Sequence, residues 1–557
     1  LIGRWQSKTM TANMSTSYHQ FRAKVDLNVP GDPDSDVRNS LNTVYVYRYS
    51  YTGGGGGGGG SPPPPIDYDI DTYQDVEEAF VGTNTGAADA KPVFDPIKSS
   101  QYLAKKSDVS ANTYGGDPVN IRTGAFEFTQ TDFSLPGRGI PIDFTRTYNS
   151  KLSERASRLG NGWSFSYNTF YYQHPETKNI QLYHGGALAS VFTTTDGGQT
   201  FKAPEGVFDT LTHEGATLVY RTLDGTRYVF SNALTNNLAS LERIIDQNNN
   251  TTLLSYTDIR GVPLLSRVTD ASGRSIVLTY GSVDDTVRWD KISTLTENAN
   301  PATPRVVTYT YNDAGNLTGV SDNRSYNGTT EQITRSFVYD ANNRLTTYTD
   351  PRGTVLRNEY DADGRVVKQY ELNPNVDTES ADRLIYEFTY EGSHANAPGS
   401  TSCTLLRSYR TSSDSFTDRV CFNSVDLKIY HEDGAGNVER WTYNADGMPT
   451  SHINQNNNTS SYAYDARRRL VREILPDIND LHTEISYTYE DGFNRLIEKK
   501  ETVTAAAGGA LIEERATRYA IDPANGNVVS STDPLGNTEQ FAYGQYGNVF
   551  THTDQKG

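Results

Sequence analysis

The sequence has 557 residues, more than one compact domain usually holds, so it predicts several domains or a repeat array. Only 35% of the residues are hydrophobic, whereas 37 are tyrosine and 47 are glycine. Tyrosine combines a large apolar ring with a polar hydroxyl, which suits half-buried sheet surfaces, so an all-β protein is favoured over one of long apolar helices. The formal net charge of −18 repels phosphates and argues against a nucleic-acid partner.

The chain shows no apolar run long enough to cross a bilayer, so it is not expected to be membrane-spanning. It carries no recognisable signal peptide and begins with Leu1 rather than methionine. We therefore expect this sequence to be part of a longer precursor.

Residues 1–65 are predicted to form an N-terminal arm. One strand is expected at residues 41–51 (LNTVYVYRYSY), where β-branched and aromatic residues alternate with polar ones. Glycines at 53–60 predict a flexible linker, and prolines at 62–65 predict a stiff continuation of it. The alternative is a polyglycine segment packed against neighbouring subunits.

Residues 66–115 are predicted to be an acidic, irregular linker. Five carboxylates have the spacing of a calcium-binding EF-hand loop: Asp67, Asp69, Asp71, Asp75 and Glu78. Thr72, however, stands where such a loop needs glycine, and Gln74 replaces its apolar anchor. A solvated linker is therefore favoured over a calcium site.

Residues 116–239 are expected to form a β-rich leading domain. Strand-like runs at 142–148 and 163–172 alternate with Gly/Pro turns, and aromatic residues recur at every second position of WSFSYNTFYY. Residues 217–221 and 226–230 are predicted to pair as a hairpin around Leu223-Asp224-Gly225.

Residues 240–557 repeat one short pattern, seen in FVYDANNRL, NEYDADGRV and YAYDARRRL. Each unit has two short β-runs and two turns, so stacked units should build one continuous sheet. The recurring tyrosine is expected to pack over the following hairpin, the aspartate to bind the backbone amides of its turn, and glycine or asparagine to accept positive φ there. The structural repeat residues are Tyr339, Asp340, Tyr360, Asp361, Gly364, Tyr443, Tyr464, Asp465 and Tyr489.

The chain has two cysteines, Cys403 and Cys421, at the open end of a predicted hairpin. The thiols then face each other and can form a disulfide, which indicates an oxidising compartment. Two unpaired buried thiols are the alternative.

No pattern in the sequence points to catalysis. The nine histidines are scattered without metal-ligand spacing, and neither a nucleophile elbow nor a phosphate-binding loop occurs. A carboxylate pair for glycoside hydrolysis stays open, because carboxylates are plentiful and nothing singles out two of them. We predict no catalytic residue, metal or cofactor, and no enzymatic activity of this segment.

The repeats resemble the RHS/YD-repeat family of bacterial polymorphic toxins and wall-associated proteins. The segment from Gly116 to about Tyr172 resembles the domain of unknown function that precedes RHS repeats. The sequence motifs that carry this resemblance are Asp117-Pro118-Val119-Asn120, Thr123-Gly124, Leu135-Pro136-Gly137-Arg138-Gly139, Arg146-Thr147-Tyr148-Asn149 and Gly160-Asn161-Gly162-Trp163-Ser164.

The resemblance implies a β-sheet strip that spirals into a hollow, cocoon-like shell. In toxin members the shell encloses a C-terminal effector, and the protein is exported. Such members end in a self-cleaving segment with paired DPxG words, but here Asp533-Pro534-Leu535-Gly536 is followed by ordinary repeat sequence. We expect neither a cleavage site nor an effector in these residues.

Three functions remain open. The first is a structural scaffold segment of a secreted or cell-surface RHS-repeat protein, with its own C-terminal effector as partner. The second is a subunit of a self-assembling extracellular filament, joined to neighbouring copies through the N-terminal arm. The third is an adhesin that binds cell-surface glycans.

Overall fold

The structure is a computed structural model that describes residues 114–555, except 138, 186, 205, 233, 235–236, 298–303, 327–328, 373–382 and 412. These residues lie in the second of two compact units, Pro65–Gly557. The predictions for the arm, its linker and the acidic EF-hand-like segment concern residues outside the described ones.

The all-β prediction is confirmed, since the described residues form 36 strands and one 3-10 helix, Ser150–Leu152. The strands are β1 Tyr114–Gly115, β2 Val119–Asn120, β3 Glu127–Leu135, β4 Ile142–Asn149, β5 Trp163–Phe165, β6 Phe170–Gln173, β7 Ile180–His184, β8 Ala187–Phe192, β9 Thr210–Glu214, β10 Thr217–Arg221, β11 Arg227–Phe230, β12 Leu238–Ile245, β13 Thr251–Ile259, β14 Val262–Thr269, β15 Ser275–Tyr280, β16 Ile292–Glu297, β17 Val306–Tyr311, β18 Leu317–Tyr326, β19 Thr329–Tyr339, β20 Leu345–Thr349, β21 Val355–Tyr360, β22 Val366–Leu372, β23 Arg383–Glu391, β24 Ser402–Tyr409, β25 Ser415–Phe422, β26 Lys428–Glu432, β27 Val438–Tyr443, β28 Pro449–Ile453, β29 Thr459–Tyr464, β30 Leu470–Ile474, β31 His482–Tyr489, β32 Leu496–Thr504, β33 Leu511–Ile521, β34 Val528–Thr532, β35 Thr538–Tyr543 and β36 Val549–Thr553.

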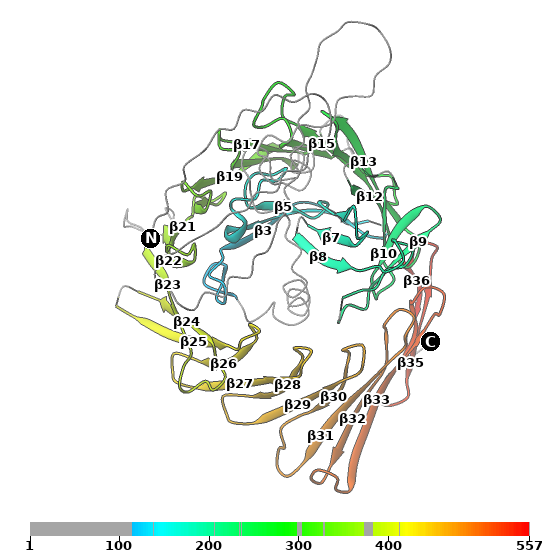
Figure 1. The fold of residues 1–557 in the computed structure, drawn as a ribbon. Coiled ribbons are helices and arrows are strands. Elements are labelled where there is room, and N and C mark those ends of the chain that lie inside the picture. Colours follow the sequence, from blue (N-terminus) through cyan, green and yellow to red (C-terminus); the bar gives the residue numbers. More distant parts are fainter. Residues whose placement is uncertain are drawn as a thin grey trace, which may run out of the picture. The chain divides into compact units, whose positions relative to one another are not determined.

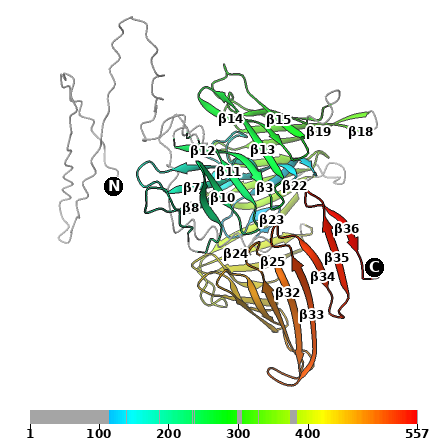
Figure 2. The ribbon, with the colours of Figure 1, turned by 90° about the vertical axis from the view of Figure 1, so that its right-hand side faces the viewer.

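Strands β6–β36 belong to one large antiparallel sheet that closes on itself. From β9 to β36 each strand pairs with the next one in the chain, and β6 joins the side of β12. The strip curves into a shell, and the small sheet β3–β5 lies inside the curve (Figure 1). Seen from the side, the strands of the shell lie next to one another in the order in which they follow along the chain (Figure 2).

The strands form where alternation predicts them, because a strand presents successive side chains to opposite faces. In β4, for example, Ile142, Phe144 and Tyr148 are buried while Asp143 and Thr145 are partly exposed. One prediction differs: the run 163–172 is broken into β5 and β6 by a turn, in which the Asn168 amide donates to the Phe165 carbonyl at 3.0 Å. The turn is needed because β5 pairs with β4 whereas β6 pairs with β12.

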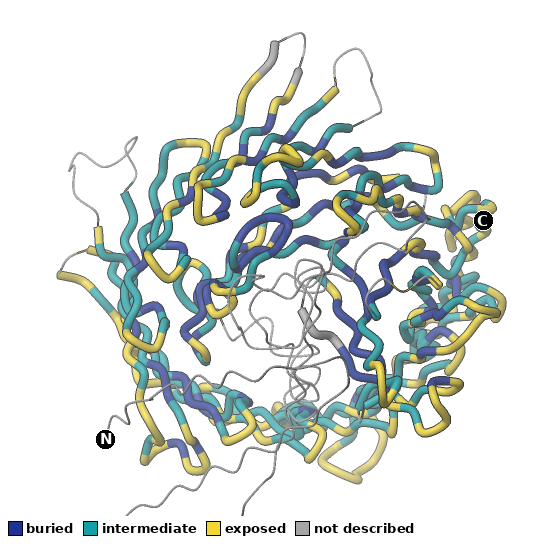
Figure 3. Tube along the Cα trace, turned by 45° about the horizontal axis from the view of Figure 1, so that its top comes forward, coloured by how far each residue is buried: buried dark blue, intermediate teal, exposed yellow. Residues whose placement is uncertain are grey.

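The main apolar core lies between β1–β5, which we call the inner domain, and the inner face of the shell. It joins Val119, Phe128 and Trp163 of the inner domain to shell residues such as Leu317 and Phe337. This buried cluster reaches along the chain as far as Phe422. Buried positions are concentrated on the inner domain and the strands around it, and exposed positions on the turns (Figure 3).

Candidate functional site: the repeat turns and the domain docked on them

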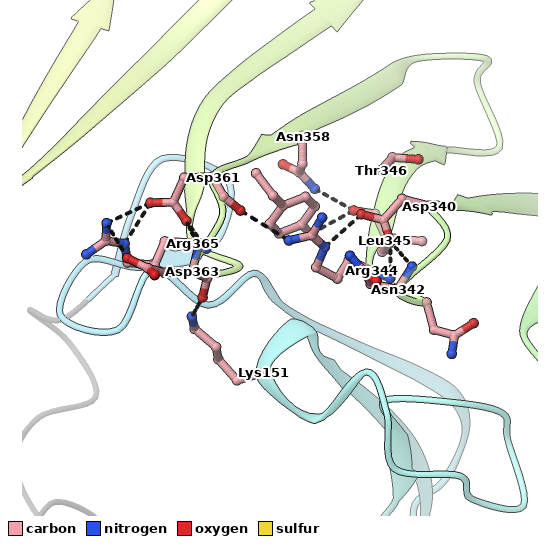
Figure 4. A network of polar contacts seen from close by, with 12 residues as sticks. Lys151, Asp340, Asn342, Arg344, Leu345, Thr346, Asn358, Asp361, Asp363 and Arg365 are labelled. Atoms are coloured by element: carbon pink, nitrogen blue, oxygen red, sulfur yellow. Dashed lines mark hydrogen bonds and ion pairs between the residues drawn. The ribbon is translucent and has the colours of Figure 1, made fainter. Parts of the chain in front are cut away.

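Each aspartate of the repeat pattern organises its own turn. Asp340 accepts hydrogen bonds from the Asn342 and Arg344 amides, both at 2.9 Å, and from the Arg344 Nε at 2.7 Å. Asp361 makes the same three bonds, with the Asp363 amide at 3.0 Å and with Arg365 (Figure 4). The carboxylate therefore replaces the backbone partners that the turn lacks, which is the role the sequence predicts.

Hydrogen bonding also holds the carboxylates of Asp361 and Asp465 in the charged form. Burial raises the pKa of Asp361, but hydrogen bonds from the Arg365 amide and guanidinium outweigh it and leave the pKa below its ordinary value. The same balance, with Arg469 as donor, lowers the pKa of Asp465. The turn also needs one residue with positive φ, and this is Gly364 at +68° in one turn and Arg468 at +61° in another. A side chain in that region is strained, so Gly364 is the better adapted of the two.

The recurring tyrosine ties neighbouring hairpins together, but backward rather than toward the following hairpin. The Tyr360 hydroxyl donates to the Leu345 carbonyl at 2.8 Å, and Leu345 is the register partner of Tyr339. Tyr339 in turn donates to the Leu317 carbonyl at 2.7 Å. The same bond to the first residue of an earlier strand is made by Tyr311, Tyr390, Tyr443, Tyr489 and Tyr543. Tyr256 and Tyr280 donate instead to carbonyls inside earlier strands, those of Leu241 and Leu265.

A β-bulge directs the tyrosine ring toward this bond. The register shifts immediately before Tyr339, Tyr360, Tyr443 and Tyr489. A bulge bends its strand and re-aims the following side chain. Phe337 and Tyr339 both lie against the core, as alternate residues of a strand do, while Val338 between them is exposed.

We expect the shell to lose stability in alkaline solution. Burial raises the pKa of Tyr311 and Tyr360 well above the ordinary value, so the folded protein keeps these hydroxyls protonated, whereas the unfolded chain ionises near pH ~10. Their stabilising contribution is complete below that pH and is lost as the pH rises through the folded pKa. Titration followed by tyrosinate absorbance should show one group ionising reversibly and a second group only on unfolding. Simple titration of all tyrosines without loss of structure would contradict this.

The inner domain docks on three successive repeat turns with one polar side chain for each. Asn161 Nδ2 donates to the Ala314 carbonyl at 3.0 Å, and the Tyr148 hydroxyl donates to the Asn343 carbonyl at 3.1 Å. Lys151 Nζ donates to the Asp363 carbonyl at 2.7 Å (Figure 4). These contacts set the position of the inner domain along the strip.

Two glycines of the inner-domain motifs are explained by how closely their backbone approaches the repeat turns. A Cβ on Gly124, which has φ of +71°, would lie 2.4 Å from the Arg365 Cβ. On Gly160 it would lie 2.7 Å from the Gly315 carbonyl oxygen. Since atoms cannot come so close, a larger residue at either position would push the inner domain off the repeat turns.

The centre of the docked interface is a buried ion pair. Arg146 Nε lies 2.8 Å from Asp132 Oδ2, and their side chains are 0% and 2% exposed. The Tyr309 hydroxyl of the shell donates to the same carboxylate oxygen at 2.7 Å. The guanidinium carbon lies 4.9 Å from the Trp163 ring centre and 5.3 Å from that of Phe337, so aromatic rings of both parts face the charge.

A second long-range junction, which we call the seam, joins turns that are far apart in the sequence. Gln247, in the turn after β12, accepts from Arg495 Nη2 at 2.5 Å and donates to Asn527 Oδ1 at 3.2 Å. Asn250 Nδ2 donates to the Tyr546 carbonyl at 2.8 Å. Phe493 is buried beside these bonds and lies against Gly225 and Gly526. The turns at one edge of the strip thus meet turns of the opposite edge, because the curved sheet brings its last strands back beside its first ones.

Cys403 and Cys421 face each other on β24 and β25 and are joined by a disulfide. Both residues are buried, together with Ala397 and Tyr430, on the outer side of the sheet. The bond closes a loop with a sequence separation of 18 residues.

Removal of this disulfide should lower the stability of the shell by about 3 kcal/mol, the value expected for a loop of such length. The Cys403→Ser/Cys421→Ser variant should melt at a lower temperature than the wild type. A reductant should bring the wild type down to the same value and leave the variant unchanged. Equal melting of the oxidised wild type and the variant would contradict a stabilising role.

The predicted repeat residues fall into two structural groups. Asp340, Asp361, Asp465 and Gly364 lie in turns at one edge of the strip, and the tyrosines Tyr339, Tyr360, Tyr443, Tyr464 and Tyr489 end the strands before those turns. In the part of the chain that is described, no three or more His, Cys, Asp or Glu residues are grouped so as to hold a metal ion, and no helix is long and apolar enough to cross a membrane.

Sequence reasoning did not assign the docking residues Tyr148, Lys151 and Asn161 or the seam residues Gln247 and Phe493. It also missed Lys428, which stands where Leu345 stands in another repeat and lies 3.8 Å above the Trp441 ring centre. Burial lowers the pKa of Lys428 to about 8, although Glu439 opposes the change. The available signal was a charged residue at an otherwise aliphatic position of the repeat.

Together, these features define a shell of tyrosine-aspartate hairpins with a small β-domain docked inside it. Family models agree with both parts. The "Domain of unknown function (DUF6531)" matches residues 116–187, and the "RHS Repeat" matches residues 339–371 and 432–477. The chain therefore contains DUF6531 followed by RHS repeats, and the resemblance to RHS/YD-repeat proteins is confirmed.

Two of the similar curated proteins come from Bacillus. The tRNA nuclease WapA of Bacillus subtilis (strain 168) is 27% identical over 168 residues, which are 29% of this chain and 7% of that protein. The tRNA3(Ser)-specific nuclease WapA of Bacillus spizizenii (strain DSM 15029) has the same identity and the same coverage. The chain thus spans less than a tenth of the curated relatives it matches.

Solved structures that resemble the fold are toxin-complex proteins. The crystal structure of TcdB2-TccC3 without its hypervariable C-terminal region gives a TM-score of 0.33 at 12% identity, covering 68% of this chain and 20% of that one. The structure of TcdB2-TccC3-TEV gives a TM-score of 0.31 at 12% identity, covering 86% of this chain and 26% of that one.

Proposed function

We propose that this β-shell scaffold encloses a C-terminal effector of its parent RHS-repeat protein and that the parent acts outside the cell or at its surface. The main support is a change along the inner face of the shell. Up to Phe422 that face packs against the inner domain, whereas beyond Phe422 it carries mostly aromatic, charged and polar side chains that are partly buried or exposed, with buried Ile485 as an exception. In this proposal the role of the chain is structural, and any reaction belongs to another part of the parent.

The strand register identifies the residues of this second inner face. Val420, a member of the core cluster, pairs with His431, and His431 pairs with Glu439. Trp441, two residues after Glu439, shares its face, while Thr442 faces the other side. Further members of the inner face are His452, Tyr462, Glu473, Tyr487, Lys499, Phe541 and His552.

Pairs on this face repeat along the strip. The rings of Trp441 and His452 stack with centres 4.8 Å apart, and those of Phe541 and His552 stack at 5.0 Å. Glu439 lies 3.6 Å from His452 and Glu539 lies 3.5 Å from His552. Such a lining offers rings and charges of both signs, which suit contact with a polypeptide of mixed composition.

Photo-crosslinking in the intact parent protein tests enclosure. A benzoyl-phenylalanine at position 441 should crosslink to peptides from the C-terminal region, as identified by mass spectrometry. The same group at position 442, one residue away but on the outer face, should not. Equal yields at both positions, or crosslinks from neither, would contradict the proposal.

The oxidising compartment expected for the disulfide supports the extracellular assignment. Fractionation of the producing cells should place the parent outside the cytoplasm, with Cys403 and Cys421 protected from alkylation. The glycan and arm-mediated filament hypotheses stay predictions.

A further inference from the structure

One end of the strip carries exposed apolar side chains on adjacent turns. Ile478, in the turn before β31, is 68% exposed, and Leu511 and Ile512, at the start of β33, are 61% and 55% exposed. The turn 505–510 between β32 and β33 contains only alanine and glycine. The β32–β33 hairpin extends beyond its neighbours in both views (Figures 1 and 2). We call residues 505–512 the apolar tip.

A groove of about 720 Å³ lies on the outer face near the opposite edge of the strip. Its apolar lining includes Val425, Leu427 and Ile453, and Val425 is 45% exposed. The groove is bordered by the repeat turns at 423–427 and 444–447. Arg440, exposed on the groove wall, lies over the Tyr430 ring.

The seam shows how these two edges fit each other. The turn that holds Gln247 and Asn250 belongs to the same edge of the strip as the apolar tip. The turn that holds Phe493 belongs to the same edge as the groove. Within one chain these edges already dock through an aromatic side chain, glycines and amide hydrogen bonds. Contact between the tip edge and the groove edge is therefore a geometry that this sheet accommodates.

From these observations we propose that the apolar tip of one copy docks in the groove of a second copy. Small residues at 505–510 let the hairpin enter the groove closely, and Leu511 and Ile512 bury against Val425 and Ile453. Glu514, 3.4 Å from Lys500 at the hairpin margin, can exchange that exposed ion pair for one with Arg440 of the second copy. The charges across the contact are thus complementary.

Such a contact is heterologous, because tip and groove are different surfaces of the same molecule. A heterologous contact builds a ring when its rotation closes and an open filament when it does not. The inference does not depend on enclosure of an effector, since both surfaces lie outside the inner face.

Mass photometry and analytical ultracentrifugation of the full chain test this docking. The wild type should form dimers and larger species as its concentration rises. Leu511→Ser/Ile512→Ser in the tip, or Val425→Asp in the groove, should weaken association by about tenfold or more. Leu535→Ser, at a neighbouring turn where Leu535 is 88% exposed, is the matched control and should associate like the wild type.

Mixing the two variants gives the sharper result. Each alone should need at least about tenfold higher concentration than the wild type to associate, but an equimolar mixture should form dimers at wild-type concentrations and no larger species, because one intact tip meets one intact groove. Circular dichroism and melting should match the wild type for all variants, since the altered side chains are exposed. A wild type that stays monomeric, a mixture that gives no dimer, or an equal loss in the Leu535→Ser control would overturn the proposal.

Discussion

Replacement of Arg146 with methionine should lower the stability of the protein by about 3–5 kcal/mol, because the buried Asp132 carboxylate then loses its partner charge. Asp132 and Arg146 are 6% and 0% exposed, so water cannot take the place of the guanidinium. Tyr309 still donates one hydrogen bond to the carboxylate, but a hydroxyl does not neutralise it. The apparent melting temperature and the guanidinium midpoint should both fall, with detachment of the inner domain.

Arg324→Met is the matched control for this prediction. Arg324 Nε lies 2.6 Å from Asp322, but its side chain is 50% exposed and Asp322 is also held by Arg305. Exposed ion pairs contribute at most about 1 kcal/mol. A second comparison, Arg146→Met with Asp132→Leu, should recover part of the loss, since it removes the unpaired charge. Similar melting of Arg146→Met and Arg324→Met would show that the buried pair is unimportant.

Replacement of Phe493 with alanine should open the seam, at a cost of about 3 kcal/mol. Phe493 is 9% exposed and fills the space beside two glycines; a Cβ on Gly526 would lie 2.5 Å from its ring. Without the ring, the amide hydrogen bonds of Gln247 and Asn527 become accessible to water. Hydrogen exchange should rise at 246–250 and 522–527, and small-angle scattering should show a larger maximum dimension.

Phe550→Ala removes the same side chain from a position that is 80% exposed, and it should change neither measurement. Exchange around the turns 340–344 and 361–365, which the inner domain covers, should be unaffected in both variants. Exchange that rises uniformly over the whole shell in Phe493→Ala would instead indicate general unfolding and would contradict a separable seam.

Local features of the fold followed from the sequence because they depend on near neighbours. The alternation at 142–148 predicted a strand, which the structure places at Ile142–Asn149, and the Asp361 turn followed from hydrogen bonds within five residues. The run 163–172 was predicted as one strand because aromatic alternation continues through it. Its division depends on distant pairing partners, β4 and β12, which no local pattern reveals.

The candidate site was predictable only in part. The sequence identified Tyr360 as a structural residue but gave the direction of its contact as forward, because a tyrosine ring can reach either neighbour. The bulge before Tyr360 directs the hydroxyl back to the Leu345 carbonyl. Arg146 stood out as part of a motif. Its burial, however, depends on Asp132 and Tyr309, which lie 14 and 163 residues away, and no local sequence pattern reveals that these residues meet.

The sequence by itself determined the all-β class, the repeated tyrosine-aspartate hairpin and the chemistry of its turns, since each depends on residues close together in the chain. The tertiary structure decided which face of the strip is inner, where the inner domain docks and which edges meet at the seam. These depend on the twist and curvature added by many successive strands. The bend at a single bulge is too small to predict from one repeat. Added up around the strip, these bends bring Gln247 beside Asn527.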